Sequence, residues 1–349
     1  MTTESAATPA GTRVPCPPAR SECARFGSIA ADGCRCRGYV GGIQCDPIEK
    51  KPFFHAFPGS LAYSFGMLGC DLHCGYCQNW VTSQALRDPA ALSPPRRATP
   101  QAMVDDALRL DARVVVSTYN EPLITTGWAM EIFKAAKQAA LTTGFVSNGN
   151  ATPLALDYLR PWTDLCKVDL KSFDDRHYRQ LGGRLQPILD TIRRLHALDV
   201  WVEIVTLLVF DFNDSNDEIE RLSNFIAEVS PEIPWHVTAF HATYRMTDRD
   251  DTSADMLARA ATIGRSNGLQ FVYAGNRPGD VGSLEQTRCA TCQTPLIERC
   301  GYEVRAYRLT ADGRCPSCET LVPCRWAQAF SAQLSPAPYV ALRTGVNGC

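Results

Sequence analysis

The sequence predicts an α/β fold, an open partial (β/α)6 barrel with small cysteine-rich additions at its two ends. Apolar, β-branched runs alternate with amphipathic helical segments through the middle of the chain. The cysteines fall into three groups that are well separated along the sequence. With 349 residues the chain is long enough for one large domain with smaller additions.

Six strands are expected, each a short apolar run bounded by polar or turn-forming residues. They are Ala62–Met67, Arg113–Thr118, Gly144–Ser147, Leu165–Leu170, Val200–Val209 and Trp235–Phe240. Helical periodicity predicts six helices: Gln101–Leu110, Thr125–Ala140, Pro153–Leu159, Leu185–Leu198, Asp217–Val229 and Ser253–Ser266. Because strands and helices alternate, we expect parallel strands joined by right-handed crossovers.

Such units fit either a doubly wound sheet or a partial barrel, and both place their sites at the carboxyl ends of the strands. The partial barrel is favoured, because a concave sheet can enclose two ligands together. The expected domains are a Cys-, Pro- and Gly-rich segment (residues 1–49), the barrel (50–280), a four-cysteine module (285–326) and a tail (327–349).

Composition and charge limit the kinds of partner and the cellular compartment that the sequence favours. The net charge is −2 with interspersed signs, so no nucleic acid or membrane partner is expected. No apolar run approaches the roughly 20 residues that span a bilayer. Since the N-terminus lacks the apolar region of a signal peptide, the sixteen cysteines favour metal binding in a reducing cytoplasm.

Cys70, Cys74 and Cys77 follow the first expected strand, with three and then two residues between them. Three such thiolates can ligate three irons of a [4Fe–4S] cluster and leave the fourth iron open, whereas electron-transfer clusters normally have four cysteine ligands. An open iron indicates a bound cofactor, and S-adenosylmethionine (SAM), cleaved reductively, fits this chemistry. The alternatives are a zinc knuckle and a chance cluster of cysteines, and the apolar, strand-like run directly before the cysteines disfavours both.

Polar side chains recur where successive strands end, and we expect them to line a ligand site. They are Asn120, Glu121, Asn148, Asp169, Lys171 and His241. Alternation places Lys167 with Asp169 and Lys171 on one face of the fourth strand. Taken singly, each has an ordinary structural explanation, such as an ion pair or a turn.

The C-terminal region contains two Cys-x-x-Cys pairs separated by 22 residues, Cys289 with Cys292 and Cys315 with Cys318. Four thiolates on two turns form a tetrahedral site of the zinc-ribbon kind. A second [4Fe–4S] cluster is the alternative, and the spacing favours zinc.

The segments Asp46–Pro52 and Cys70–Trp80 resemble the radical SAM enzyme of the AmmeMemoRadiSam system, which is similar to the pyruvate formate-lyase-activating group. The resemblance covers roughly residues 16–326 and implies the radical SAM partial barrel, with the cluster on Cys70, Cys74 and Cys77.

The same resemblance implies roles for the strand-end residues. Tyr76 is the aromatic residue of the signature loop, and Asn120 and Glu121 lie near the SAM amino group. Lys171, paired with Asp169, faces the SAM carboxylate, and His241 lies near the ribose or adenine.

Three departures from the family pattern are visible. Ala19 stands where a second N-terminal cysteine is usual, Phe210–Asp214 replaces a Pro-Gly before Asn-Asp, and Cys300 replaces a basic residue.

The sequence therefore predicts a radical SAM enzyme that generates a 5′-deoxyadenosyl radical to abstract hydrogen from an unidentified small molecule or protein. An electron donor such as flavodoxin or ferredoxin is the expected partner. The alternatives are an activase of a glycyl-radical enzyme and, in a different class, a non-catalytic zinc or Fe–S interaction module.

Overall fold

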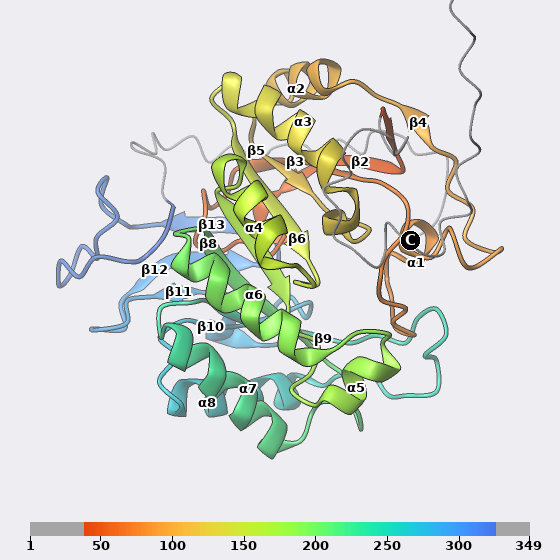
Figure 1. The fold of residues 1–349 in the computed structure, drawn as a ribbon. Coiled ribbons are helices and arrows are strands. Elements are labelled where there is room, and N and C mark those ends of the chain that lie inside the picture. Colours follow the sequence, from red (N-terminus) through yellow and green to blue (C-terminus); the bar gives the residue numbers. More distant parts are fainter. Residues whose placement is uncertain (1–37, 326–349) are drawn as a thin grey trace, which may run out of the picture.

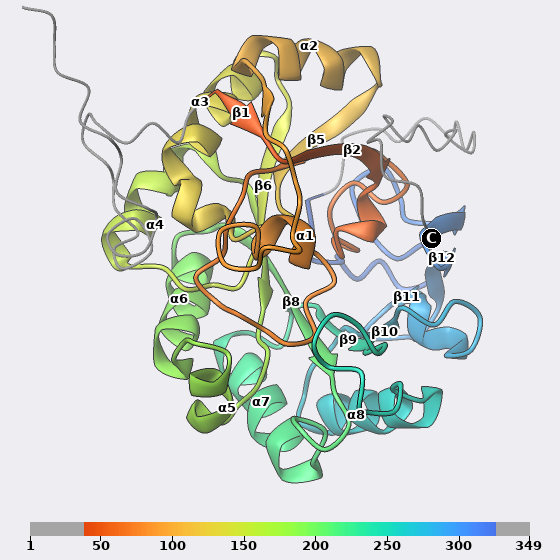
Figure 2. The ribbon, with the colours of Figure 1, turned by 90° about the vertical axis from the view of Figure 1, so that its right-hand side faces the viewer.

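The computed structural model describes residues 38–325. Most of the expected N-terminal segment, including Cys16, Ala19, Cys23 and Cys36, lies outside the described residues, as does the expected tail. The architecture is a single large sheet with helices on one side and a small three-stranded sheet on the other (Figures 1 and 2).

The large sheet is mostly parallel, and the predicted fold class is confirmed. Its strands, in spatial order, are β10 (Val272–Gly275), β9 (Trp235–Ala239), β8 (Trp201–Leu208), β7 (Leu165–Asp169), β6 (Thr142–Ser147), β5 (Ala112–Ser117), β3 (Leu61–Gly66) and β2 (Gly42–Pro47). All neighbours are parallel except β2, which pairs antiparallel with β3. No pairing among residues 38–325 joins β10 to β2, so the barrel is open.

The six expected strands all lie in the large sheet, and two strands of that sheet were missed. The short strands β1 (Tyr39–Val40) and β4 (Arg96–Arg97), which pair with each other, and the strands of the four-cysteine module were also not expected. β10 is too short, at four residues, to stand out as an apolar run. β2 has only one fully buried apolar residue, Cys45, and ends in Asp46-Pro47, a sequence typical of a turn. β2 pairs with β3 in the large sheet, although it lies within the segment 1–49 that was expected to precede the barrel.

All six expected helices form: α2 (Pro100–Arg109), α3 (Thr126–Gln138), α4 (Pro153–Leu159), α6 (Leu185–Ala197), α7 (Asn216–Val229) and α8 (Ala254–Ser266). The short helices α1 (Trp80–Ser83) and α5 (Asp175–Gln180) are additional. Thr99 and Thr152 cap α2 and α4 by accepting hydrogen bonds from the backbone N–H three residues on, at 3.3 and 3.2 Å. No helix within residues 38–325 is long and apolar enough to cross a membrane.

Side-chain alternation along the strands builds a core on each face of the sheet. On β5, Val115 packs into the core beneath the helices, whereas Val114 and Val116 pack on the opposite face with Ile48 and Phe53. The segment that follows β2, which includes the 3-10 helix η1 (Ile48–Lys50), thus fills part of the concave face of the open barrel.

A buried carboxylate, Glu203 of β8, holds this filling segment in place. Its oxygens accept hydrogen bonds from the backbone N–H groups of Phe54 and His55, both at 2.9 Å. The Trp201 indole donates to it at 3.1 Å, and His236 Nε2 lies 2.7 Å away. Burial tends to raise the pKa of Glu203, but these partners hold it below its usual value.

The four-cysteine module contains the antiparallel strands β11 (Thr287–Arg288), β12 (Pro295–Cys300) and β13 (Glu303–Tyr307). Arg299 of β12 is buried and donates to Thr287 Oγ1 and to the Phe54 carbonyl, each at 2.8 Å. Its Nε lies 3.5 Å from the buried Glu49 carboxylate. A buried cation therefore docks the module against the segment that fills the barrel.

Replacing Glu203 with leucine is predicted to destabilise the protein by roughly 3–5 kcal/mol, because buried N–H groups lose their acceptor. The free energy of unfolding, measured by urea denaturation, checks this. Asp190→Leu is the matched control, because that exposed carboxylate lies 3.4 Å from Arg193 on the surface of α6 and should change stability little. Equal stability of the two variants would contradict the assigned role of Glu203.

Candidate functional site

The cysteine-bearing loop leaves the carboxyl end of β3 and leads into α1. A Cβ on Gly66 would collide with the Thr118 carbonyl oxygen, so glycine lets β3 pass close to the end of β5. The Gly69 N–H donates to the Thr82 carbonyl at 3.0 Å, and the Gly69 carbonyl accepts from the Glu121 N–H at 3.2 Å. These bonds tie the loop both to α1 and to the next strand end.

The three cysteines occupy different positions in this loop. Cys74 is buried in an apolar cluster that includes Leu72, Tyr76 and Phe240. Cys77 is partly buried, with its Sγ 3.1 Å from Ser83 Oγ. Cys70 is also partly buried, and its Sγ lies 3.7 Å from the Asp71 carboxylate.

A cavity of about 390 Å³ opens beside the loop, on the concave face of the sheet. This volume falls in the range of small-molecule sites, about 300–1,000 Å³. One wall holds Cys74, Tyr76 and Cys77, and the others come from strand ends, from η1 and from the four-cysteine module. The lining side chains with ionisable or hydrogen-bonding groups include Glu49, Lys50, Lys51, Thr118, Tyr119, Lys167, Asp169, Lys171, His236, Thr238, Asn276, Glu285 and Tyr302.

Lys167, Asp169 and Lys171 form a row along β7 inside the cavity. The Asp169 carboxylate pairs with Lys167 through one oxygen and with Lys171 through the other, at 3.2 Å for Lys171. Burial tends to raise the pKa of Asp169, but the two ammonium groups lower it to about 2. Burial tends to lower the pKa of Lys171, and Asp169 outweighs it and raises that pKa well above its usual value. Asp169 and Lys171 are therefore both charged at neutral pH.

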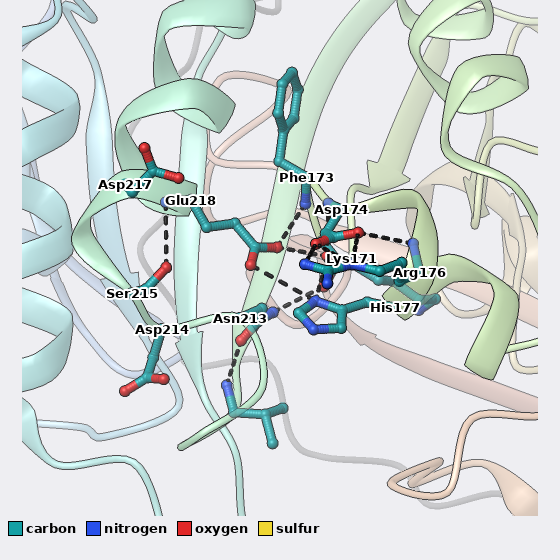
Figure 3. Close-up of polar contacts among 12 residues, drawn as sticks. Lys171, Phe173, Asp174, Arg176, His177, Asn213, Asp214, Ser215, Asp217 and Glu218 are labelled. Carbon is teal, nitrogen blue, oxygen red and sulfur yellow. Dashed lines mark hydrogen bonds and ion pairs between the residues drawn. The ribbon is translucent and has the colours of Figure 1, made fainter.

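Hydrogen bonds behind β7 fix the backbone at Lys171 (Figure 3). Asn213 donates to the Lys171 carbonyl at 2.8 Å, and the Tyr178 hydroxyl accepts from the Lys171 N–H at 3.0 Å. Glu218 of α7 accepts from Ser172 Oγ and, at 2.7 Å, from the Phe173 N–H. The altered loop of residues 210–214 thus still supplies an asparagine that positions the row.

The expected ligand residue Glu121 faces away from the cavity. Its carboxylate is buried and accepts from the Leu123 N–H at 2.9 Å, from Ser147 Oγ at 2.7 Å and from the Asn148 N–H at 2.7 Å. Burial, and next the Asp71 carboxylate, raise its pKa to about 8. The neighbouring Asn120 accepts from the Met67 N–H at 2.9 Å, so its side chain is also engaged outside the cavity.

Asp71 connects the cysteine loop to the end of β6. Its carboxylate accepts from Asn148 Nδ2 at 2.7 Å and from Asn150 Nδ2 at 2.6 Å. Sequence reasoning assigned no role to Asp71, although its position directly after Cys70 was the available signal. The two asparagines thereby hold the loop rather than face the cavity.

The expected residues therefore divide into two sets. Tyr76, Asp169 and Lys171 lie together in the cavity wall with Cys74 and Cys77. Cys70, Asn120, Glu121, Asn148 and His241 are not among the described lining residues. The His241 side chain is 42% exposed, and its Nδ1 lies 3.0 Å from Asp251.

Several lining residues were missed by sequence reasoning. Tyr119 has a positive φ of 71°, an uncommon conformation for a non-glycine residue that often occurs at functional sites. Lys51 is buried and donates to Asp46 at 2.9 Å and to the Tyr119 hydroxyl at 3.0 Å. Asn276 follows the strand that was missed, and Tyr302 lies on the β12–β13 turn, so neither had a sequence signal at a predicted strand end.

Cys289, Cys292, Cys315 and Cys318 form a second candidate site. Their sulfur atoms lie within 4.8 Å of one another, and Cys289 and Cys315 are buried. Such a thiolate set fits zinc or iron. Cys70, Cys74 and Cys77 do not form such a compact group of sulfur atoms. A [4Fe–4S] cluster does not require one, because each thiolate binds a different iron.

Comparison with known proteins agrees with this geometry. Residues 66–226, which contain the cysteine loop and β7, match the radical SAM superfamily. An uncharacterized protein of Methanocaldococcus jannaschii is 32% identical over 283 residues, which cover 80% of this chain and 83% of that protein. A pyruvate formate-lyase-activating enzyme of Staphylococcus aureus (strain USA300) is 28% identical over 53% of this chain and 76% of its own length.

Among solved structures, a radical SAM methyltransferase from Sphaerobacter thermophilus shares the fold, with a TM-score of 0.50 and 16% identity. The similarity covers 63% of this chain and 68% of the methyltransferase chain. The expectation of a radical SAM enzyme is confirmed at the level of the superfamily. On its sequence similarity and its fold, the chain belongs to the radical SAM superfamily.

Proposed function

We propose that Cys70, Cys74 and Cys77 ligate a [4Fe–4S] cluster and that SAM occupies the adjoining cavity. The observation that carries this proposal is the cavity itself, which has two of the three cysteines on one wall and the charged β7 row on another. When bound, the cluster and SAM supply one-electron cleavage of SAM to methionine and a 5′-deoxyadenosyl radical, which abstracts hydrogen from a substrate.

The residues of the row suit the amino-acid end of SAM. Asp169 is ionised and offers an acceptor for the ammonium group, and Lys171 offers a cation for the carboxylate. Tyr76 is buried between the cysteines and packs edge-on to Phe212, with ring centroids 6.2 Å apart. The Tyr76 ring lines the loop side of the cavity and excludes water there, with Phe212 packed against it.

The remaining expected residues act from behind the wall in this proposal. The cysteine loop and the neighbouring strand ends are held by hydrogen bonds from the side chains of Asn120, Glu121 and Asn148. We therefore propose that these residues position the cysteine loop. A contact between His241 and the ribose or adenine would require its ring to turn away from Asp251.

We propose two finer assignments, one from a relative and one from the resemblance of a sequence segment. The match to a pyruvate formate-lyase-activating enzyme favours, as a second candidate, an activase acting on a glycyl-radical protein. The segment Asp46–Pro52, which marks the resemblance to the AmmeMemoRadiSam enzyme, contributes Glu49, Lys50, Lys51 and Pro52 to the cavity. This placement supports a role of the segment in substrate choice.

Flavodoxin or ferredoxin is the proposed electron donor, and a reducing cytoplasm is the proposed location.

Zinc is the proposed occupant of the four-cysteine site. Cys289 and Cys292 lie on the turn between β11 and β12, and Cys315 and Cys318 lie on a turn after β13, between the bridged residues Arg314 and Leu321. The four sulfurs converge from two turns, as in a zinc ribbon. Its proposed role is structural. Strand β12 of this module supplies Arg299, which donates a hydrogen bond to the Phe54 carbonyl in the segment that fills the concave face.

Anaerobic reconstitution with iron and sulfide, followed by SAM and dithionite, is predicted to give 5′-deoxyadenosine from the wild-type protein. Cys74→Ala should abolish this product, because one iron loses its ligand. Product quantified by liquid chromatography checks both outcomes.

Cys166→Ala is the matched control, because that thiol is buried in the core on the helix side of β7 and should leave product formation intact. If SAM binds a protein carrying a verified cluster but no 5′-deoxyadenosine forms, a substrate must bind first. If SAM does not bind, the proposed function is wrong.

Lys171→Met is predicted to weaken SAM binding at least about tenfold while the cluster is retained, because a charge-assisted contact worth about 1.5–3 kcal/mol is lost. Equilibrium dialysis with labelled SAM measures the affinity. Lys134→Met, a change of the same kind on the exposed face of α3, should have no effect. Unchanged affinity in Lys171→Met would remove this residue from the site.

A further inference from the structure

A second cleft lies at the opposite end of the sheet from the cysteine loop. It has a volume of about 430 Å³ and is formed where the end of α8 and the start of β10 meet β11 of the four-cysteine module. Arg265 comes from the last turn of α8, and Arg288 from β11, directly before Cys289. Three glutamines, Gln270, Gln286 and Gln293, complete its polar lining.

The two arginines bring positive charge into the cleft without acidic residues. No Asp or Glu is among the described residues that line it. The hydrogen bonds of both guanidinium groups go to neutral oxygens: Arg265 to the Val272 carbonyl at 3.4 Å, and Arg288 to the Gln293 carbonyl at 3.0 Å and the Gln286 side chain at 3.4 Å. Arg288 Nε is buried and has no hydrogen-bond partner.

The charges also act on each other. Burial lowers the pKa of Arg265, and the neighbouring Arg288 guanidinium lowers it further. The carboxyl end of α8 adds only about half a negative charge, so the cleft keeps an excess of positive charge. Two guanidinium groups that share one cleft with amide donors match the oxygens of a phosphate or carboxylate group.

We propose that this cleft binds a small anion through Arg265 and Arg288, the ligand carrying a phosphate or carboxylate group. Such a ligand bridges α8 of the barrel and β11 of the four-cysteine module and holds the two together. This anion site is separate from the proposed SAM cavity and does not depend on the proposed function. It lies at the other end of the strands and would select its ligand by charge and shape.

The test is calorimetric titration of the holoprotein with inorganic phosphate and, separately, with succinate, at constant ionic strength set by chloride. Saturable binding is expected, with at least about tenfold weaker affinity in the double variant Arg265→Gln, Arg288→Gln. The control is Arg109→Gln, Arg194→Gln, which alters two exposed arginines already paired with Asp106 and Asp157. Tighter phosphate or tighter succinate identifies which of the two groups the ligand carries.

A single variant, Arg265→Glu, provides an independent check. It places a carboxylate beside Arg288, so it should abolish the anion response and raise the melting temperature of the ligand-free protein. The proposal is overturned if the double variant binds like the wild type, if chloride alone produces the same heat, or if Arg265→Glu still binds phosphate or succinate with wild-type affinity.

Discussion

The concave face of the sheet carries ionised side chains that must be paired inside the protein, and this constraint organises the molecule. Lys167, Asp169 and Lys171 neutralise one another in part along β7. On β8, the buried Glu203 carboxylate is held by a 2.7 Å hydrogen-bond contact with His236 of β9, whose pKa burial keeps below its usual value. A buried charge without a partner here would lower the stability of the folded protein by several kcal/mol. The segments that supply the partners are therefore held in place by these contacts. The resulting cavity carries charged side chains in its wall and adjoins the cysteine loop.

The cavity depends on segments far apart in the sequence. The chain after β2 fills part of the concave face because Glu203 accepts its Phe54 and His55 N–H groups. The four-cysteine module docks on this segment through Arg299. Its β12–β13 turn brings Gly301 and Tyr302 to the cavity. The four-cysteine module, although remote from the cysteine loop in sequence, therefore contributes to the shape of the candidate active site.

Sequence patterns predicted much of the fold, because strands such as Val114–Val116 and caps such as Thr99 depend on local chemistry. β2 and β10 were missed, since one lacks apolar alternation and the other is short. For the site, periodicity placed Asp169 and Lys171 on the inner face. It could not show that Glu121 turns back to cap backbone N–H groups, because that orientation depends on Ser147 and Asn148 from another strand.

The most direct test of the central claim is electron paramagnetic resonance of the dithionite-reduced, reconstituted protein with the four-cysteine site disabled by Cys292→Ser and Cys318→Ser. A cluster signal that is lost when Cys74→Ala is added then arises from the cysteine loop. A reduced [4Fe–4S] signal whose shape changes when SAM is added is the predicted result, because SAM binds at the open iron. A signal that SAM leaves unchanged, or iron-loaded protein without a cluster signal, would contradict the assignment of the loop and its cavity.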